Sequence, residues 1–146
     1  MKIAFDSSTL VAACVQNHPK HAAAFGWLQK AKHQQIEGLV CAHSLLETFS
    51  VLTRAPFKPK ISPTDARNLI FQNIIPFTTV IGLSPSDYPR LIEDLASKGF
   101  EGGIVYDGSL LFCAAKGGAE KIVTANSADF LRLAQAFNFE IDIVGI

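Results

Sequence analysis

Short apolar segments alternate with helical patterns along the whole chain, and this alternation constrains the fold more than any other feature. Strand-like segments are expected at residues 3–5, 39–41, 77–81, 122–124 and 141–144. Helical patterns fill the intervals, at residues 9–16, 19–32, 43–53, 63–73, 85–98, 107–116 and 127–136. Strands that alternate with helices form βαβ units, and their right-handed crossovers bring the carboxyl ends of the strands to one edge. We therefore predict an α/β fold with three layers, α/β/α, around a central, mostly parallel sheet.

Composition is consistent with one compact domain over residues 1–146, because 49% of the residues are hydrophobic. The 13 basic residues balance the 13 acidic ones, so net charge indicates no class of partner. No segment approaches the roughly 18 apolar residues of a membrane span, and Asp6 interrupts any signal peptide. The three cysteines form no CxxC pair, as in proteins of a reducing compartment. We expect a cytoplasmic protein with no membrane partner.

Three acidic residues lie where ordinary surface charge does not explain them. Asp6 directly follows the first strand, and Asp107 is expected to open a helix between two apolar segments. Glu47 lies within the 43–53 helix, whose apolar stripe is predicted to comprise Leu45, Leu46, Phe49 and Leu52. Helical spacing puts Glu47 on a different stripe, from which it can point toward the ends of the strands. Ligands bind at that edge in open α/β sheets, so we expect these carboxylates to meet there.

A fourth ligand is expected just beyond the 122–124 strand, where Asn126 and Asp129 are both candidates. Together with the three acids, either would complete a cluster that contains only oxygen ligands. Such ligands suit Mg²⁺ or Mn²⁺, ions that promote phosphodiester hydrolysis. Taken singly, Asp6 has a simpler explanation as the cap of the 9–16 helix, for which Ser7 or Ser8 also qualify, and Asp107 has one as a cap or first-turn residue. We interpret the set as a catalytic cation site.

A basic loop directly follows the Glu47 helix. It supplies positive charge and one aromatic ring, through Arg54, Phe57, Lys58 and Lys60. Binding of RNA requires cations for the phosphates and favours rings for stacking. We predict that Arg54, Lys58 and Lys60 contact a nucleic-acid substrate, although a solvated turn would have the same composition.

Four segments, in their order and spacing, resemble those of the PIN-domain ribonucleases, and most closely those of the VapC toxins of type II toxin–antitoxin pairs. The matching segments are residues 3–11, 44–54, 106–115 and 121–130. The resemblance implies a parallel sheet wrapped by helices and an endoribonuclease that depends on Mg²⁺ or Mn²⁺. It implies metal-ligand roles for Asp6, Glu47 and Asp107.

The same resemblance implies several further roles. Asn126 occupies a position where many relatives have Asp, so whether Asn126 or Asp129 completes the site, and whether it holds one ion or two, stays open. Ser7 and Thr124 lie where the family often places a hydroxyl near the metal and the substrate. The resemblance also implies a homodimer and a cognate antitoxin, with part of the apolar helix pair at residues 9–32 as the interaction surface.

Two other functions fit parts of the sequence. An aspartate-nucleophile phosphatase would use Asp6 after its strand, but such enzymes usually carry a second acid two residues later, where this chain has Ser8. A catalytically degenerate PIN-fold binding module would have lost the fourth acid. Binding of Mn²⁺ and cleavage of RNA separate this module from the nuclease.

Overall fold

A single five-stranded sheet forms the centre of the computed structural model, which describes all 146 residues. The strands are β1 (Lys2–Phe5), β2 (Glu37–Cys41), β3 (Thr78–Ile81), β4 (Lys121–Thr124) and β5 (Asp142–Gly145). Their order is β3-β2-β1-β4-β5, and every neighbouring pair is parallel. The predicted α/β fold is confirmed, with a sheet that is parallel throughout.

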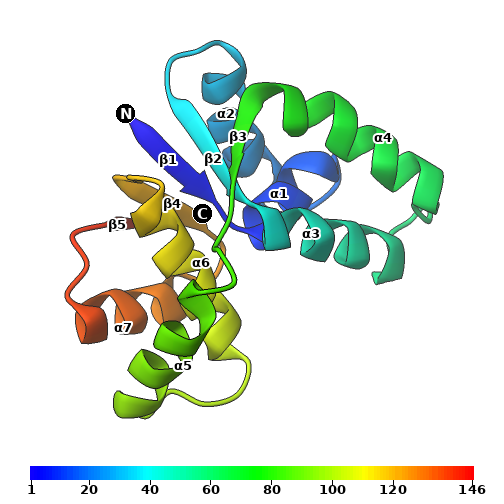
Figure 1. Ribbon diagram of the computed structural model, residues 1–146. Helices are drawn as coiled ribbons and strands as arrows, with labels where there is room; N and C mark the ends of the chain where they lie inside the picture. Colours follow the sequence, from blue (N-terminus) through cyan, green and yellow to red (C-terminus); the bar gives the residue numbers. More distant parts are fainter.

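Seven α-helices cover the two faces of the sheet (Figure 1). One face carries α1 (Ser7–Cys14), α2 (His21–Lys32), α3 (Ala42–Arg54) and α4 (Pro63–Asn73). The other carries α5 (Asp87–Ser97), α6 (Ile104–Lys116) and α7 (Ser127–Phe137). None of the helices combines the length and the hydropathy that a membrane span requires.

Alternation along the strands explains the three layers. In β1, Ile3 and Phe5 join the core cluster of α1–α4, whereas Ala4 joins the cluster of α5–α7. In β4, Val123 and Ile122 divide in the same way. Successive side chains of a strand point to opposite faces, so a strand covered on both faces must be apolar throughout. This is why the strands read as short continuous apolar segments rather than as alternating ones.

The strand order reverses between β1 and β4. From β1 the chain builds outward through β2 and β3, then returns across the sheet to β4 and β5. Crossovers leave this switch point in opposite directions, so a crevice opens at the carboxyl ends of the two strands, where α/β proteins bind ligands. The residues that follow β1 and end β4 are Asp6 and Thr124, so the topology places both at this crevice.

Three helices begin elsewhere than predicted. The cap of α1 is Asp6, not Ser7 or Ser8, because the Asp6 carboxylate accepts from the Thr9 amide. The helix α2 starts at His21, so Pro19 lies outside it. The helix α6 starts at Ile104, after Gly102 at φ +72°, so Asp107 lies in its first turn rather than opening it. The predicted start of α4 is confirmed, with Ser62 accepting from the Asp65 amide at 3.1 Å.

The apolar stripe predicted for the 43–53 helix is wrong at Leu46. This side chain is 68% exposed, whereas the fully buried positions of α3 are Ser44, Thr48 and Leu52. Thr48 is tolerated inside because its hydroxyl donates to the Ser44 carbonyl at 2.6 Å. The face of α3 that carries Leu46 therefore lies at the surface.

Most of the apolar surface of residues 9–32 is internal. The side chains of Leu10, Val11 and Leu28 belong to the buried core, whereas Phe25 is exposed. The large exposed apolar side chains lie mainly on other helices, at Leu46, Phe71, Tyr88, Ile92, Tyr106 and Leu131. Burial thus leaves little of α1 for the interaction surface that the sequence predicted there.

Candidate active site

Asp6 is held by a dense set of hydrogen-bond donors. It is buried, and its Oδ2 accepts from Thr124 Oγ1 at 2.6 Å. Its Oδ1 accepts from the Thr9 amide at 2.9 Å and from Ser8 Oγ at 2.7 Å. A buried carboxylate needs such partners because burial without them is costly. These bonds fix the orientation of Asp6 and supply no positive charge to neutralise it.

Glu47 reaches the same crevice from α3. Its Oε1 accepts a hydrogen bond from Ser7 Oγ, at the first position of α1. Its Oε2 lies 3.7 Å from Nε2 of His43, one turn earlier on the helix. The two contacts orient the carboxylate away from the buried face of α3, as the helical spacing predicted.

Asp107, Asn126 and Asp129 form a third group, which joins α6 to the start of α7. The side-chain nitrogen of Asn126 donates to Asp107 Oδ2 at 3.3 Å and to Asp129 Oδ2 at 2.9 Å. Because only the amide nitrogen donates, Asn126 bridges the two acids through its NH₂ group. Both candidates for the fourth position thus lie beside Asp107.

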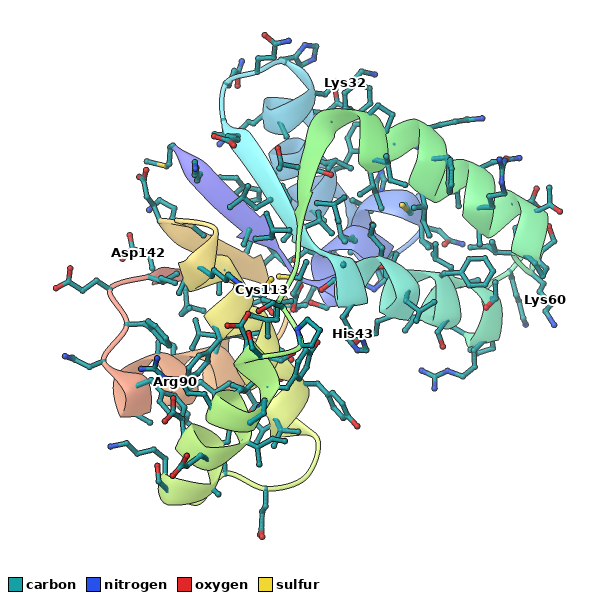
Figure 2. The ribbon with its side chains drawn as sticks, viewed as in Figure 1. Lys32, His43, Lys60, Arg90, Cys113 and Asp142 are labelled. Carbon is teal, nitrogen blue, oxygen red and sulfur yellow. The ribbon has the colours of Figure 1, made fainter.

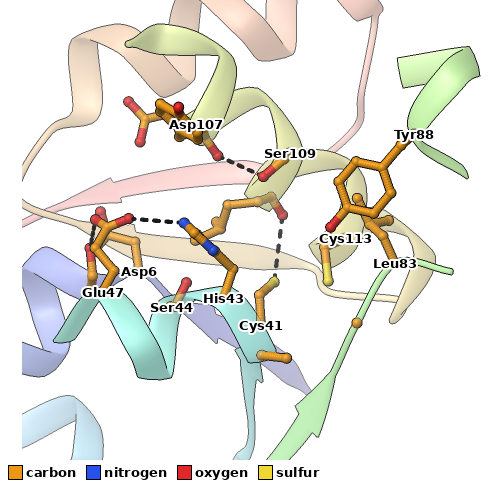
Figure 3. A pocket seen from close by; sticks show the side chains of 15 residues that line it. Asp6, Cys41, His43, Ser44, Glu47, Leu83, Tyr88, Asp107, Ser109 and Cys113 are labelled. Atoms are coloured by element: carbon orange, nitrogen blue, oxygen red, sulfur yellow. Dashed lines mark hydrogen bonds and ion pairs between the residues drawn. The ribbon is translucent and has the colours of Figure 1, made fainter. Parts of the chain in front are cut away.

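The carboxylates of three separate segments meet at one pocket (Figure 3). Asp6, Glu47 and Asp107 all line it, together with Ser7, His43 and Tyr106. His43 and Cys113, both labelled in Figure 2, line this pocket as well. The meeting of Asp6, Glu47 and Asp107, which the sequence predicted, is therefore found at the switch point of the sheet.

Electrostatic repulsion within this pocket is visible in Asp107. Burial, followed by the negative charges of Asp6, Asp129 and Glu47, raises the pKa of Asp107 from 3.8 to about 6. The hydrogen bond from Asn126 acts in the opposite direction. Clustered carboxylates raise one another's pKa when no cation offsets their charge. The site therefore favours a bound positive charge.

The donor set fits a hard divalent cation. No three His, Cys, Asp or Glu side chains lie together in the arrangement of a preformed metal centre. Mg²⁺ needs no such cage, because it keeps several waters and is usually bound through one or two carboxylates and the substrate phosphate. Carboxylate oxygens without a thiolate also favour Mg²⁺ or Mn²⁺ over zinc.

Several predicted substrate contacts lie outside the pocket. Thr124 is fully buried and gives its hydroxyl to Asp6, so it orients that carboxylate rather than touching substrate. Ser7 lines the pocket but donates to Glu47. Arg54, Lys58 and Lys60 do not line it, and Lys60 lies well away from His43 in Figure 2. Only a substrate longer than the pocket would reach this basic loop.

Three residues of the site had no predicted part in its chemistry. Ser8, predicted only as a possible helix cap, donates through Oγ to Asp6 and accepts from the Ala125 amide at 3.0 Å, so it links the start of α1 to the loop after β4. His43 and Tyr106 line the pocket beside the carboxylates. The spacing of His43 and Glu47, four residues apart on a helix, was a usable signal, whereas nothing in the sequence pairs His43 with Tyr106.

Comparison with known proteins identifies what the chain resembles. The PIN domain family model matches residues 2–128. Ribonuclease VapC27 of Mycobacterium tuberculosis is 35% identical over 118 residues, which cover 81% of this chain and 80% of that protein.

Solved structures share the fold at low identity. The sarcin–ricin loop cleaving toxin VapC20 of M. tuberculosis is 16% identical with a TM-score of 0.64, covering 82% of this chain and 86% of that one. VapBC2 of Rickettsia felis, bound to a DNA fragment from its promoter, is 18% identical with a TM-score of 0.67, covering 100% and 99%.

Proposed function

The chain belongs to the PIN-domain family, as a VapC-type ribonuclease, and from this membership we propose that it is an endoribonuclease toxin whose activity depends on Mg²⁺ or Mn²⁺. One observation carries the proposal of metal dependence. Carboxylates from three separate elements, Asp6, Glu47 and Asp107, line one pocket whose lining includes no lysine or arginine. In a pocket that opens at the switch point of a parallel sheet, this charge is suited to a cation and the phosphate that it attracts.

The residues that would hold the ion are Asp6, Glu47 and Asp107, directly or through water, with Asn126 and Asp129 beside them. When bound, a divalent ion supplies a Lewis acid for the phosphodiester and lowers the pKa of a water molecule. The reaction is hydrolysis, in which oxygen from water joins phosphorus and the bond from phosphorus to O3′ breaks. The products carry a 5′-phosphate and a 3′-hydroxyl.

The protein's own contribution to this reaction is orientation. Ser8, Thr9 and Thr124 hold the Asp6 carboxylate, and Ser7 holds that of Glu47. Asn126 keeps Asp107 and Asp129 together despite their like charges. Side chains fixed in this way need little reorganisation when charge develops on the phosphate.

A cognate antitoxin and a second copy of the chain are the partners that we propose. Support comes from the family and from structural neighbours such as VapBC2, whose name denotes a pair of proteins. An antitoxin segment that offers a cation to the acidic pocket would meet the same electrostatic demand as a metal ion. Sedimentation of the chain alone, and with a co-expressed antitoxin, tests both partners.

The test of the proposed function is cleavage of RNA by the purified chain with Mg²⁺ or Mn²⁺. We expect cleavage in the presence of either ion and none in excess EDTA, with activity restored when the ion is returned. Titration calorimetry with Mn²⁺ should show binding. Absence of both cleavage and ion binding would favour the degenerate binding module, whereas full activity in EDTA would contradict the metal dependence.

The phosphatase is the less favoured alternative. Both oxygens of Asp6 already accept hydrogen bonds from buried donors, and Ser8 stands where a second acid is usual. A covalent aspartyl-phosphate trapped on Asp6 would nevertheless support it.

The basic loop yields a prediction about RNA affinity. Replacing Lys58 and Lys60 together with alanine should weaken binding of a long RNA and reduce its dependence on salt, because each lost phosphate contact lowers the slope of log K against log salt by about 0.7. Binding is measured by filter retention at several salt concentrations. Lys98→Ala, an exposed lysine after α5, serves as the control. An unchanged slope in the double variant would remove this loop from the RNA-binding surface.

A further inference from the structure

An apolar hollow lies directly beside the acidic pocket, between α5 and the start of α6. It is lined mainly by Tyr88, Leu91, Ile92, Leu95, Phe100 and Tyr106. Its volume of about 340 Å³ is in the range of small-molecule sites, roughly 300–1,000 Å³. Two of the lining side chains, Ile92 and Tyr106, are largely exposed and contribute little to the buried core. The stability of the fold therefore does not explain why they are apolar or aromatic.

The hollow and the acidic pocket are continuous. Four residues line both of them, namely His43, Tyr88, Tyr106 and Ser109. Three of these four carry a ring, and Figure 3 shows His43 beside Glu47 and Tyr88 near Leu83 and Cys113. A group that occupies the hollow therefore lies next to the carboxylates that would act on a phosphate.

The border between the two cavities presents a flat aromatic surface. The rings of His43 and Tyr106 have centroids 6.1 Å apart and planes only 13° from parallel, an offset stack. Tyr106 is 62% exposed, and more than half of the His43 side chain is exposed as well. Exposed tyrosine and histidine rings are the surfaces on which proteins stack unpaired bases.

The chemistry of the neighbouring pocket favours a base as the occupant. The carboxylates can hold a cation for one phosphate, but no lysine or arginine lines the pocket to bind the rest of the nucleotide, so attraction that does not depend on charge would add to binding there. Stacking on rings provides it and tolerates every base. A base within an A-form helix has both faces covered by its neighbours, so only an unpaired nucleotide presents a face to these rings.

We propose that His43, Tyr88 and Tyr106 form a stacking subsite for an unpaired nucleobase next to the phosphate that is cleaved. The proposal rests on the ribonuclease function proposed above and adds to it the residues that hold the base beside the cleaved phosphate. The aliphatic walls formed by Leu91, Ile92 and Leu95 enclose the remainder of the base.

The experiment measures binding of single-stranded oligoribonucleotides that carry 2-aminopurine at each position in turn. An Asp6→Asn background with Mg²⁺ keeps the RNA intact. We expect binding to quench the fluorescence at one position, and a duplex of the same sequence to give no quenching. Tyr106→Leu should remove the quenching and raise the Kd by roughly 5- to 140-fold, the loss of one stacked base.

Two matched variants separate stacking from other causes. Tyr106→Phe keeps the ring and should bind as the background protein does. Phe71→Leu removes an exposed ring on α4, remote from the hollow, and should also leave binding unchanged. Ile92→Asp, which puts a charge into the hollow, should weaken binding by a comparable factor, and circular dichroism checks that each variant is folded.

Failure of the subsite is distinguishable from failure of the ribonuclease function. If the unaltered chain cleaves RNA and Tyr106→Leu binds and cleaves equally well, the subsite is wrong and the nuclease stands. If the unaltered chain cleaves no RNA with either ion, the proposed function itself fails. If Tyr106→Leu instead abolishes self-association in sedimentation without changing RNA binding, the hollow is a protein–protein surface and the proposal is overturned.

Discussion

Replacing Asp6 with asparagine is expected to lower RNA cleavage by about 100- to 1,000-fold while the chain stays folded, a loss typical of removing one preorganised electrostatic group from an active site. Asp6 is the most firmly held carboxylate of the pocket, with donors on both oxygens. Asparagine has the same shape, and the hydroxyls of Ser8 and Thr124 can rotate to accept from its amide. What the substitution removes is the negative charge that binds a cation.

The measurement is the initial rate of cleavage at saturating Mg²⁺ or Mn²⁺, together with the thermal unfolding curve of each protein. The matched control is Asp142→Asn, the same change at an exposed aspartate at the start of β5, paired with Lys121 at 2.9 Å. This variant should keep normal activity, since exposed ion pairs contribute only about 0–1 kcal/mol and this pair lies at the opposite edge of the sheet. Normal cleavage by Asp6→Asn would place the reaction elsewhere.

Replacing Asp107 with asparagine is expected to lower cleavage by a comparable factor, about 100- to 1,000-fold, and at the same time to stabilise the metal-free protein at neutral pH. The second effect follows from the pKa of about 6 that burial and the charges of Asp6, Asp129 and Glu47 give to Asp107. In the folded chain its ionised form is disfavoured, whereas in the unfolded chain it ionises near 3.8. Removing the charge removes this repulsion.

The dependence on pH has a definite sign. Below about 3.8 the carboxyl group is protonated in both states and contributes nothing. Between 3.8 and about 6 only the unfolded chain releases the proton, so stability falls as pH rises, and above 6 the loss is complete. A shift of this size corresponds to about 3 kcal/mol for a fully buried group. Because Asp107 is partly exposed, screening reduces this to about 1 kcal/mol, or about 2–4 °C in Tm.

The measurement is thermal unfolding in EDTA between pH 4 and pH 8. The Tm difference between Asp107→Asn and the unaltered chain should be small at pH 4 and largest above pH 6. Adding Mg²⁺ should raise the Tm of the unaltered chain, because the ion binds only the folded state, and should raise that of the variant less. A variant less stable than the unaltered chain at pH 8 in EDTA would contradict the repulsion argument.

Local signals were enough to predict most of the fold. Ser62 and Pro63 marked the start of α4 because a cap and a proline satisfy and preset the first turn of a helix. The strands were recognisable because both faces of the sheet are covered, which makes each strand apolar throughout. Errors occurred where local signals conflict. The start of α6 was placed at Asp107 because an acid is typical of a first turn, whereas the glycines at 102–103 already end the loop there.

The exposure of Leu46 shows a second limit of the sequence. A leucine on an amphipathic helix is normally buried, yet the buried positions of α3 include Ser44 and Thr48 beside Leu52, and the Thr48 hydroxyl donates to the Ser44 carbonyl. Which stripe of a helix faces the core depends on how closely it packs against its neighbours. Here two of the three buried positions carry small polar side chains, which the helical period of the apolar residues alone does not reveal.

The sequence alone determined the order of strands and helices and the position of Asp6, Glu47 and Asp107 in them, because these depend on local periodicity and on residue type. The tertiary structure decided how the side chains meet. It assigned Thr124 to Asp6, made Asn126 a bridge between two acids, and set His43 against Tyr106. These contacts join residues as far as 118 positions apart. The distances between these side chains depend on strand order, strand register and side-chain rotamers. The local sequence pattern predicts none of the three.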